Sequence, residues 1–276
     1  AEQTMTINTY SSYVLDESMQ YSVNGGEWVQ LTAETAITFG GDKGTLRLRG
    51  KSANGTAASS SSRAQISFGD DNVQVACSGD IRTLVDYEIY ATVSTANARF
   101  CSLFEGCESL TSAPDLPATT LADHCYRNMF RLCTSLTAAP ELPATTLTEY
   151  CYYLMFYDCT SLTVAPELPA TTLADNCYES MFRLCTSLTV APELPATTLA
   201  DDCYRSMFYD CTNLTTAPEL PATTLANFCY RYMFWNCPNL TMAPELPATT
   251  LARYCYANMF YGCTSLTAAP ELLATT

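Results

Sequence analysis

The feature that most constrains the fold of this chain is a 26-residue unit that recurs from Cys107 to the end. The copy from Cys159 to Leu184 reads CTSLTVAPELPATTLADNCYESMFRL. Two series of cysteines keep the same period, at Cys133, Cys159, Cys185, Cys211, Cys237 and Cys263 and at Cys125, Cys151, Cys177, Cys203, Cys229 and Cys255. A period in the twenties indicates a solenoid, in which each unit buries its apolar face against its neighbours.

Each unit predicts one short strand and one helix. Leu162–Val164 is the candidate strand, and it ends at Pro166 because proline cannot donate to a ladder. Thr172–Asp175 has the form of a helix capping box, which recurs at 120–123, 146–149 and 198–201 and is missing at 224–227 and 250–253. We expect the helix to run to about Leu184. Its apolar residues share one predicted buried face: Leu173, Cys177, Met181, Tyr178, Phe182 and Cys185.

These patterns predict an α/β fold with two domains. Residues 94–276 are expected to form a leucine-rich-repeat-like solenoid of about six and a half coils, with a short strand plus a helix in each 26-residue coil. Residues 1–93 are expected to form a small all-β sandwich domain. This domain is either a binding module or a cap for the first coil, and we favour the cap because an uncapped coil exposes its core.

Short alternating runs support the β prediction for the N-terminal residues. Thr45–Arg49 alternates strictly, as a half-buried strand does. Asn24-Gly25-Gly26 is a hairpin signal because these residues accept positive φ. Further strands are predicted at 64–68, 73–76 and 88–93. The polar stretch Lys51–Arg63 is predicted to be an exposed loop.

Composition excludes several classes of partner. The formal net charge is −15, which disfavours nucleic acids, whose phosphate backbones it repels, and anionic membrane surfaces. No run of about 18 apolar residues exists, so no membrane insertion is expected. The first ten residues lack the basic and apolar regions of a secretion signal, and the chain is expected to start as a mature protein.

The fifteen cysteines allow three interpretations. Metal binding is disfavoured because no CxxC pair occurs and His124 is the single histidine. Disulfides suit an exported protein, but on a helix Cys177 and Cys185 would be about 12 Å apart, beyond the roughly 7 Å limit between Cα atoms. We favour ladders of buried free thiols, with Cys77 and Cys101 outside both series.

Comparison of the copies with one another shows where the unit varies. The varying positions are those of 149–150, 153–154 and 157–158, on the face opposite the predicted core. Aromatic residues and arginine are typical of binding surfaces, although a freely varying solvent face is an equal alternative. The candidate binding residues, called here the variable stripe, are Tyr150, Tyr153, Tyr157, Arg183, Arg205, Tyr209, Phe228, Arg231, Tyr232, Trp235, Tyr254 and Tyr261.

A second recurring feature is one carboxylate in each unit. A row of carboxylates could hold hard cations, but more often it is a solvated edge, which we favour here. The row comprises Glu141, Glu167, Glu193, Glu219 and Glu245. We predict no metal and no cofactor. The sequence contains no phosphate-binding glycine loop, no GxSxG and no HExxH, so we predict that the protein is not an enzyme.

The recurring run MFxxCTSLTxAPELPATTLxxxCYxxMF resembles the BspA-like leucine-rich repeats of bacterial surface proteins, particularly those of Bacteroides. The resemblance covers residues 94–276, and the segments YSVNGGEW and LRLRGKS resemble the β-domain that precedes such repeats. It implies an extracellular or cell-surface adhesion protein that binds a host matrix protein, a glycan or another bacterium.

An alternative function is a structural subunit of an extracellular fibre or of a phage or bacterial appendage. Glu271-Leu272-Leu273 replaces the Glu-Leu-Pro of earlier units, and the chain stops within a repeat. We therefore expect either that the chain is truncated or that its C-terminal coil stacks on another molecule. End-to-end stacking of this kind gives a fibre, because such head-to-tail contacts do not close into a ring.

Overall fold

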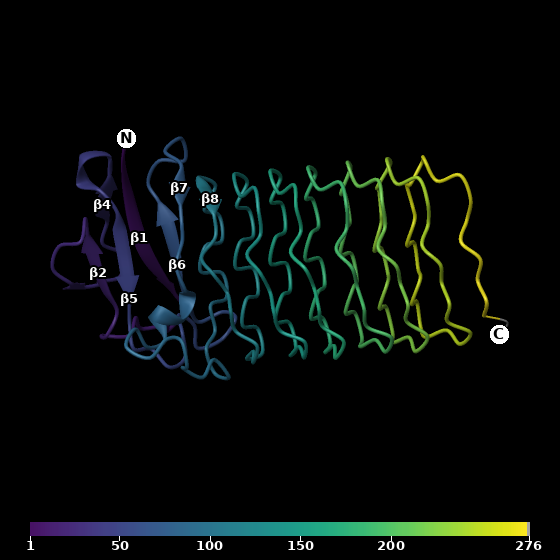
Figure 1. The fold of residues 1–276 in the computed structure, drawn as a ribbon, viewed down its shortest axis with the longest axis horizontal. Helices are drawn as coiled ribbons and strands as arrows, with labels where there is room; N and C mark the ends of the chain where they lie inside the picture. Colours follow the sequence, from purple (N-terminus) through teal and green to yellow (C-terminus); the bar gives the residue numbers. More distant parts are fainter. Residues whose placement is uncertain (275–276) are drawn as a thin grey trace.

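The computed structural model describes residues 1–274, which form one elongated stack (Figure 1). The N-terminal strands lie at one end and successive coils follow along the long axis to the C-terminus. A single hydrophobic core runs from Met5 in the first strand to Cys263 in the last complete coil. No helix among residues 1–274 has the length and apolar character needed to cross a membrane.

Two antiparallel sheets make up most of the N-terminal region. The first has the order β4-β1-β6, from Ile37–Gly40, Glu2–Tyr10 and Arg63–Phe68. The second has the order β3-β2-β5, from Val29–Gln30, Gln20–Val23 and Leu46–Arg49. The hairpin between β2 and β3 turns at Asn24 and Gly25, whose φ angles are 52° and 71°.

A third, parallel pair joins this region to the solenoid. β7, Val75–Ala76, pairs with β8, Leu110–Ser112, which belongs to the first coil. Two short 3-10 helices complete the region, η1 at Gly41–Lys43 and η2 at Ile81–Leu84.

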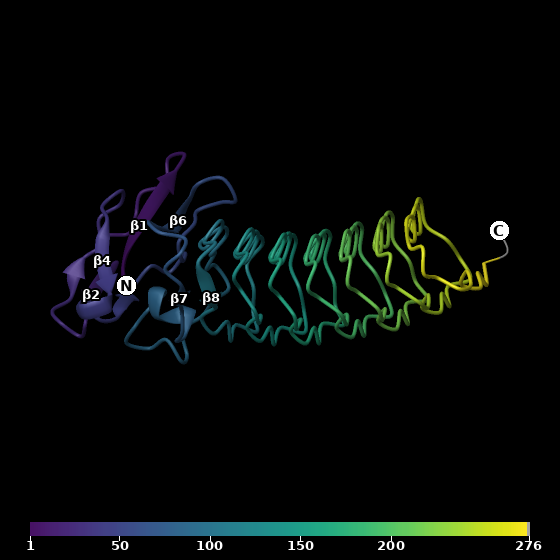
Figure 2. The same cartoon turned by 90° about the horizontal axis from the view of Figure 1, so that it is seen from above.

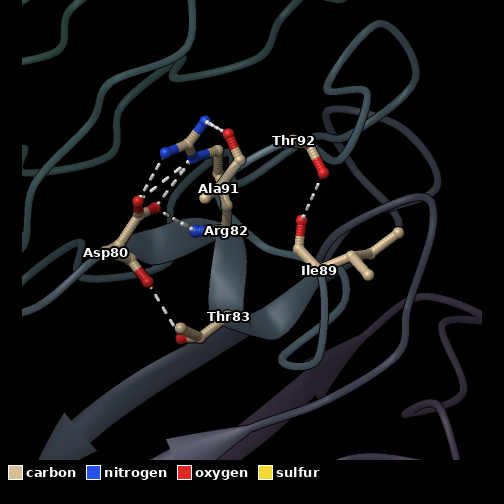
Figure 3. A network of polar contacts seen from close by, with 6 residues as sticks. All are labelled: Asp80, Arg82, Thr83, Ile89, Ala91 and Thr92. Carbon is tan, nitrogen blue, oxygen red and sulfur yellow. Dashed lines mark hydrogen bonds and ion pairs between the residues drawn. The ribbon is translucent and has the colours of Figure 1, made fainter.

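A polar network fixes the chain where it leaves β7 (Figure 3). Asp80 caps η2 by accepting from the backbone N–H of Arg82 at 2.9 Å, and its Oδ2 accepts from Arg82 Nη2 at 2.7 Å. Arg82 also donates to the Ala91 carbonyl at 3.2 Å. The strand predicted at 88–93 is therefore wrong, since a turn replaces it in which Thr92 Oγ1 donates to the Ile89 carbonyl.

The stretch predicted to be an exposed loop, Lys51–Arg63, is exposed only in part, because its middle lies against the first coil. Thr56 and Ala57 are fully buried. The Thr56 N–H donates to the Arg99 carbonyl at 2.8 Å, and the Ile66 N–H in β6 donates to the Leu103 carbonyl at 2.7 Å. The N-terminal region thus covers the end of the solenoid core, which is what a cap does.

The predicted helix in each coil is wrong, and with it the prediction of a leucine-rich-repeat-like α/β fold. Residues 1–274 contain no α-helix. Residues 174–185 and their copies form instead a run of linked turns, called here the turn ribbon. Every fourth residue of the ribbon has positive φ, as at Asn176 (57°), Ser180 (56°) and Leu184 (65°).

The hydrogen bonds of the turn ribbon alternate between two directions. One set closes turns three residues back, as from the Met181 N–H to the Tyr178 carbonyl at 3.2 Å. The other set reaches the next coil, as from the Phe182 N–H to the Met207 carbonyl at 3.0 Å. An α-helix would use all of these donors inside one segment, whereas here half of them bind the neighbouring coil.

The predicted strand is reduced to isolated contacts. In place of a ladder at Leu162–Val164, one parallel bridge joins Val164 to Ala138 in the preceding coil. The predicted capping boxes are also wrong, because no helix begins there. Their acidic residues bind the next coil instead: Asp175 Oδ1 accepts from the Asp201 N–H at 3.0 Å, and Asp201 Oδ1 from the Asn227 N–H at 2.8 Å.

The inward side chains of each turn ribbon stack on their copies. Phe156 and Phe182, both fully buried, have ring centroids 5.7 Å apart, and Tyr152 and Tyr178 have centroids 5.6 Å apart. Burying an aromatic ring of this size stabilises a fold by about 1.5–3 kcal/mol. The same ladder repeats along the whole solenoid, and this packing holds the coils in register.

All fifteen cysteines, which lie within the described residues, are free thiols. In one series each thiol donates to the phenylalanine carbonyl of the preceding coil, as from Cys159 Sγ to Phe130 O at 3.1 Å. That carbonyl also accepts from the Cys133 N–H of its own coil at 3.1 Å. The cysteine thus serves both as a small apolar residue and as a donor between coils.

Candidate functional site

The variable stripe lies on the outward side of the turn ribbon. Inward and outward side chains alternate in pairs along the ribbon. In one coil Tyr204 and Met207 are buried, whereas Arg205 and Tyr209 are only partly covered. The varying positions therefore share one face, although that face is not a helical one.

One column of the stripe runs the length of the solenoid. Glu105 forms an ion pair with Arg131 at 2.6 Å, and the Arg131 guanidinium lies 5.1 Å from the centroid of the Tyr157 ring. The next members are one more guanidinium and then three aromatic rings in succession. Their order is Arg183, which lies 4.2 Å from the Tyr209 ring, then Trp235 and Tyr261.

The most continuous part of the stripe lies on the coils of 228–261. Phe228 stacks on Tyr254 with centroids 5.5 Å apart. Arg231 lies 4.5 Å from the Tyr232 ring and donates from Nη2 to the Tyr232 hydroxyl at 2.7 Å. We call this group of residues the aromatic cluster: Phe228, Arg231, Tyr232, Trp235, Tyr254 and Tyr261.

Trp235 joins the two halves of the aromatic cluster. Its ring meets Tyr232 edge-on at 5.3 Å and stacks on Tyr261 at 4.0 Å between centroids. Edge and offset contacts of this kind stabilise aromatic pairs by about 0.5–1.5 kcal/mol. Phe228, Arg231, Tyr232 and Trp235 are half-buried, whereas Tyr254 and Tyr261 on the following coil are 56% and 62% exposed.

A smaller group lies near the start of the solenoid. His124 stacks on Tyr150 at 5.0 Å, and Arg127 lies 4.7 Å from the Tyr153 ring. Burial, together with the charge of Arg127, lowers the pKa of His124. The neutral ring therefore predominates near neutral pH, and it stacks as an aromatic side chain does.

Arg205 stands apart from the aromatic residues of the stripe. Its Nη1 lies 3.3 Å from Asp202 Oδ1 and 3.7 Å from Glu179 Oε1. Burial raises the pKa of Glu179, while the Asn176 amide and Arg205 oppose that shift. Arg205 is thus part of a local ion network.

Four residues of this face are missing from the predicted set, although a signal for them exists in the sequence. Arg127 and Arg131 hold the repeat positions of Tyr153 and Tyr157, so alignment of the copies would have found them. The missing residues are His124, Arg127, Arg131 and Arg253.

Several arginines on this outward face lack carboxylate partners. No ion pair within residues 1–274 involves Arg127, Arg183, Arg231 or Arg253. The Nε atoms of Arg183 and Arg231 are buried without a hydrogen-bond partner. These guanidinium groups place positive charge on an otherwise acidic chain, which favours partners with acidic or planar groups.

The carboxylate row lies on another side of the coil. All five glutamates of the row are exposed, and no ion pair or hydrogen bond within the described part of the chain engages their carboxylates. A shallow groove beside Glu219 and Glu245 is lined by Pro218, Pro221 and Pro244. Across residues 1–274, no three histidine, cysteine, aspartate or glutamate side chains gather as metal ligands would.

Comparisons with protein-family models, with curated proteins and with solved structures found no match to this chain.

Proposed function

We propose that this is a non-enzymatic recognition protein of the cell surface or extracellular space, which binds a host matrix protein, a glycan or another cell through the variable stripe. The resemblance of the repeat to BspA-like surface proteins supports the class of function. The observation that carries the proposal is the aromatic cluster, a continuous group of half-buried and exposed rings with a guanidinium that forms no ion pair within residues 1–274.

Coil stacking does not require these outward residues. The buried phenylalanine, tyrosine and cysteine ladders already hold the coils in register, and they are nearly the same in every copy. The outward positions differ from coil to coil, so they can change without loss of the fold. Tyrosine, tryptophan and arginine are also the residues that contribute most to binding energy at interfaces.

The columns further suggest the shape of the partner. Rings and guanidinium groups follow one another over several coils, and an extended partner could contact many of them at once. Many weak contacts along one partner add to avidity. A polymeric glycan or a fibrous matrix protein fits this surface better than a small molecule does.

The test compares two double variants. Tyr232→Ser with Tyr254→Ser removes two rings of the aromatic cluster, and Tyr10→Ser with Tyr90→Ser removes two exposed rings of the N-terminal region. Retention of the chain would be measured on surfaces coated with extracellular-matrix protein or with mucin glycans. The first variant should lose at least about tenfold in affinity, equivalent to about 1.4 kcal/mol, and the second should bind normally.

Thermal unfolding separates binding from stability. The Tyr10 and Tyr90 variant should unfold within a few degrees of the parent, because surface substitutions change stability by only about 0.5 kcal/mol. The Tyr232 and Tyr254 variant also loses two aromatic contacts of about 0.5–1.5 kcal/mol each, and it should unfold earlier but remain fully folded at the assay temperature. Unchanged retention of the Tyr232 and Tyr254 variant would contradict the proposal. Filaments in electron micrographs of the unmodified chain would instead favour the fibre-subunit alternative.

A further inference from the structure

The core of the N-terminal region is less completely covered than that of the coils. Phe39, Phe68, Leu46 and Leu48 face the core, but all four are only partly buried, whereas the phenylalanines of the inner coils are fully buried. A cleft of about 840 Å³ lies among these residues. Its volume and its apolar floor are typical of binding sites.

Two strands border this cleft, each with one free edge. β5 pairs only with β2, and β7 pairs only with β8. In Figure 1 the strands β2, β5, β7 and β8 follow one another along the long axis, and Figure 2 shows β2 and β7 on the opposite side of the region from β1 and β6. The sheet that contains β5 is thus interrupted before β7.

The hydrogen-bond register shows which peptide groups of β5 are free. The Asn24 N–H donates to the Thr45 carbonyl at 2.7 Å. Every second residue from Thr45 onward, namely Arg47 and Arg49 in β5, therefore directs its peptide groups to β2. In an antiparallel ladder the alternate residues point their peptide groups to the other side. The N–H and C=O groups of Leu46 and Leu48 therefore point into the cleft.

The edge of β7 that borders the cleft also has peptide groups without a partner strand. The N–H groups of Val75 and Cys77 donate to the first coil, to Ser109 O at 2.9 Å and to Ser112 O at 3.2 Å. Ala76 lies opposite Ser112 in the parallel ladder, between these two bonded residues, so its own peptide groups point away from β8. Gln74, Ala76 and Ser78 all line the cleft. Both borders of the cleft thus have unpaired donors and acceptors at alternate positions.

We propose that an extended peptide segment of a partner protein binds in this cleft as an added β-strand between β5 and β7. Strand addition satisfies the free peptide groups of both edges, and side chains on one face of the peptide fill the apolar floor. The paired part of the segment is short, because β5 has four residues and β7 has two.

Charge specifies the other face of the bound segment. Arg47 and Arg49 alternate with Leu46 and Leu48, so their side chains lie on the side of β5 away from the floor. Arg49 lies 4.0 Å from the Trp28 ring and 4.1 Å from the Tyr87 ring, and its Nε donates to Gln20 Oε1 at 2.8 Å. Neither Arg47 nor Arg49 has an ion-pair partner in residues 1–274. The structure therefore favours a peptide in which apolar residues alternate with acidic ones.

The probe is an acetylated, amidated peptide in which valine and glutamate alternate over about nine residues, within the usual length of a strand. Binding would be measured by fluorescence anisotropy of a labelled copy and by protection of Cys77 from alkylation. Cys77 lines the cleft and is the one cysteine of residues 1–274 that is not buried. A valine and lysine peptide of the same length is the control for charge.

Two substitutions at one position test the edge itself. Ala76→Pro removes the free N–H that faces the cleft but leaves the bonds of Val75 and Cys77 intact, whereas Ala76→Val keeps that N–H. We expect Ala76→Pro to weaken binding at least about tenfold and Ala76→Val to bind normally. Equal affinity of the two variants would overturn the proposal.

A modified peptide gives an independent test in the unmodified protein. The same probe with alternate amides N-methylated cannot donate along one edge, and we expect it not to bind or protect Cys77. If the N-methylated peptide protected Cys77, the cleft would bind an apolar ligand and not an added strand. The same conclusion would follow if dodecanoate protected Cys77 and the valine and glutamate probe did not. Tyr232→Ser should leave probe binding unchanged, so this result is independent of the aromatic cluster.

Discussion

The Sγ atom of Cys185 lies 3.1 Å from the carbonyl oxygen of Phe156 in the preceding coil. Both residues are fully buried, and the same contact recurs between Cys211 Sγ and the Phe182 carbonyl at 3.0 Å. The thiol thus links two coils while it fills space in the core. This relationship explains why cysteine occupies one phase of every unit.

Cys185→Ala should lower the free energy of unfolding by about 1–2 kcal/mol, since it removes a buried sulfur and one hydrogen bond between coils. Cys77→Ala, at a partly exposed thiol, should change it by less than about 0.5 kcal/mol. Urea unfolding under reducing conditions measures both. Equal effects would show that the Cys185 contact contributes nothing.

Stability should fall at alkaline pH. Burial raises the pKa of the Cys151 and Cys229 thiols to about 12, whereas an unfolded thiol ionises near pH 9. The folded protein holds the proton more tightly, so this contribution is complete below pH 9 and is lost as the pH rises toward 12. Urea midpoints near neutral pH and at about pH 10 should differ, with the second lower. An unchanged midpoint would contradict this burial.

The turn ribbon predicts an unusual response to glycine. Leu184 has a φ of 65°, which costs a leucine about 1 kcal/mol, whereas the neighbouring Arg183 has no such strain. Leu184→Gly should therefore destabilise the protein less than Arg183→Gly, by about 1 kcal/mol. If residues 174–185 were helical, the two substitutions would cost about the same. Far-ultraviolet circular dichroism of the parent should also lack the double minimum of an α-helix.

The contact between Asp201 and Asn227 predicts how substitutions of Asp201 change the stability of the protein. Asp201 Oδ1 accepts from the Asn227 N–H at 2.8 Å, and Asn227 Oδ1 in turn accepts from the Arg253 N–H at 3.3 Å. Asp201→Ala should cost about 1 kcal/mol because it leaves an N–H without its partner. Asp201→Asn keeps the oxygen that accepts from the Asn227 N–H but replaces Oδ2, which accepts from Asn227 Nδ2 at 3.2 Å, so it should cost less than Asp201→Ala. A similar loss in both variants would indicate that charge matters rather than the hydrogen bond.

The amino-acid sequence by itself determined the period of the stack and which side chains the coils bury. Cys177, Met181 and Phe182 were predicted to be buried, and they are fully buried. This prediction succeeds because each copy places the same side chain against the same neighbour. The varying positions follow from the same comparison, which is why alignment of the copies identifies the outward face.

The tertiary structure alone decided the backbone conformation. Apolar residues four apart suit an amphipathic helix and also a ribbon that turns every four residues, so Cys177 and Met181 do not distinguish them. The distinction depends on donors such as the Phe182 N–H, which finds its acceptor in Met207 of the next coil. The asparagine, aspartate and serine residues at positive φ, such as Asn176 and Ser180, were the local signal.

The N-terminal region combines features that its sequence predicts with features that only the folded chain has. Its strands could be predicted in part, because alternation at Thr45–Arg49 is a local property. The burial of Thr56 against Arg99 and the free edges of β5 and β7 could not, because they depend on segments far apart in the chain. Local sequence specifies which residues are apolar and where turns are allowed, whereas hydrogen-bond partners between distant segments exist only in the folded chain.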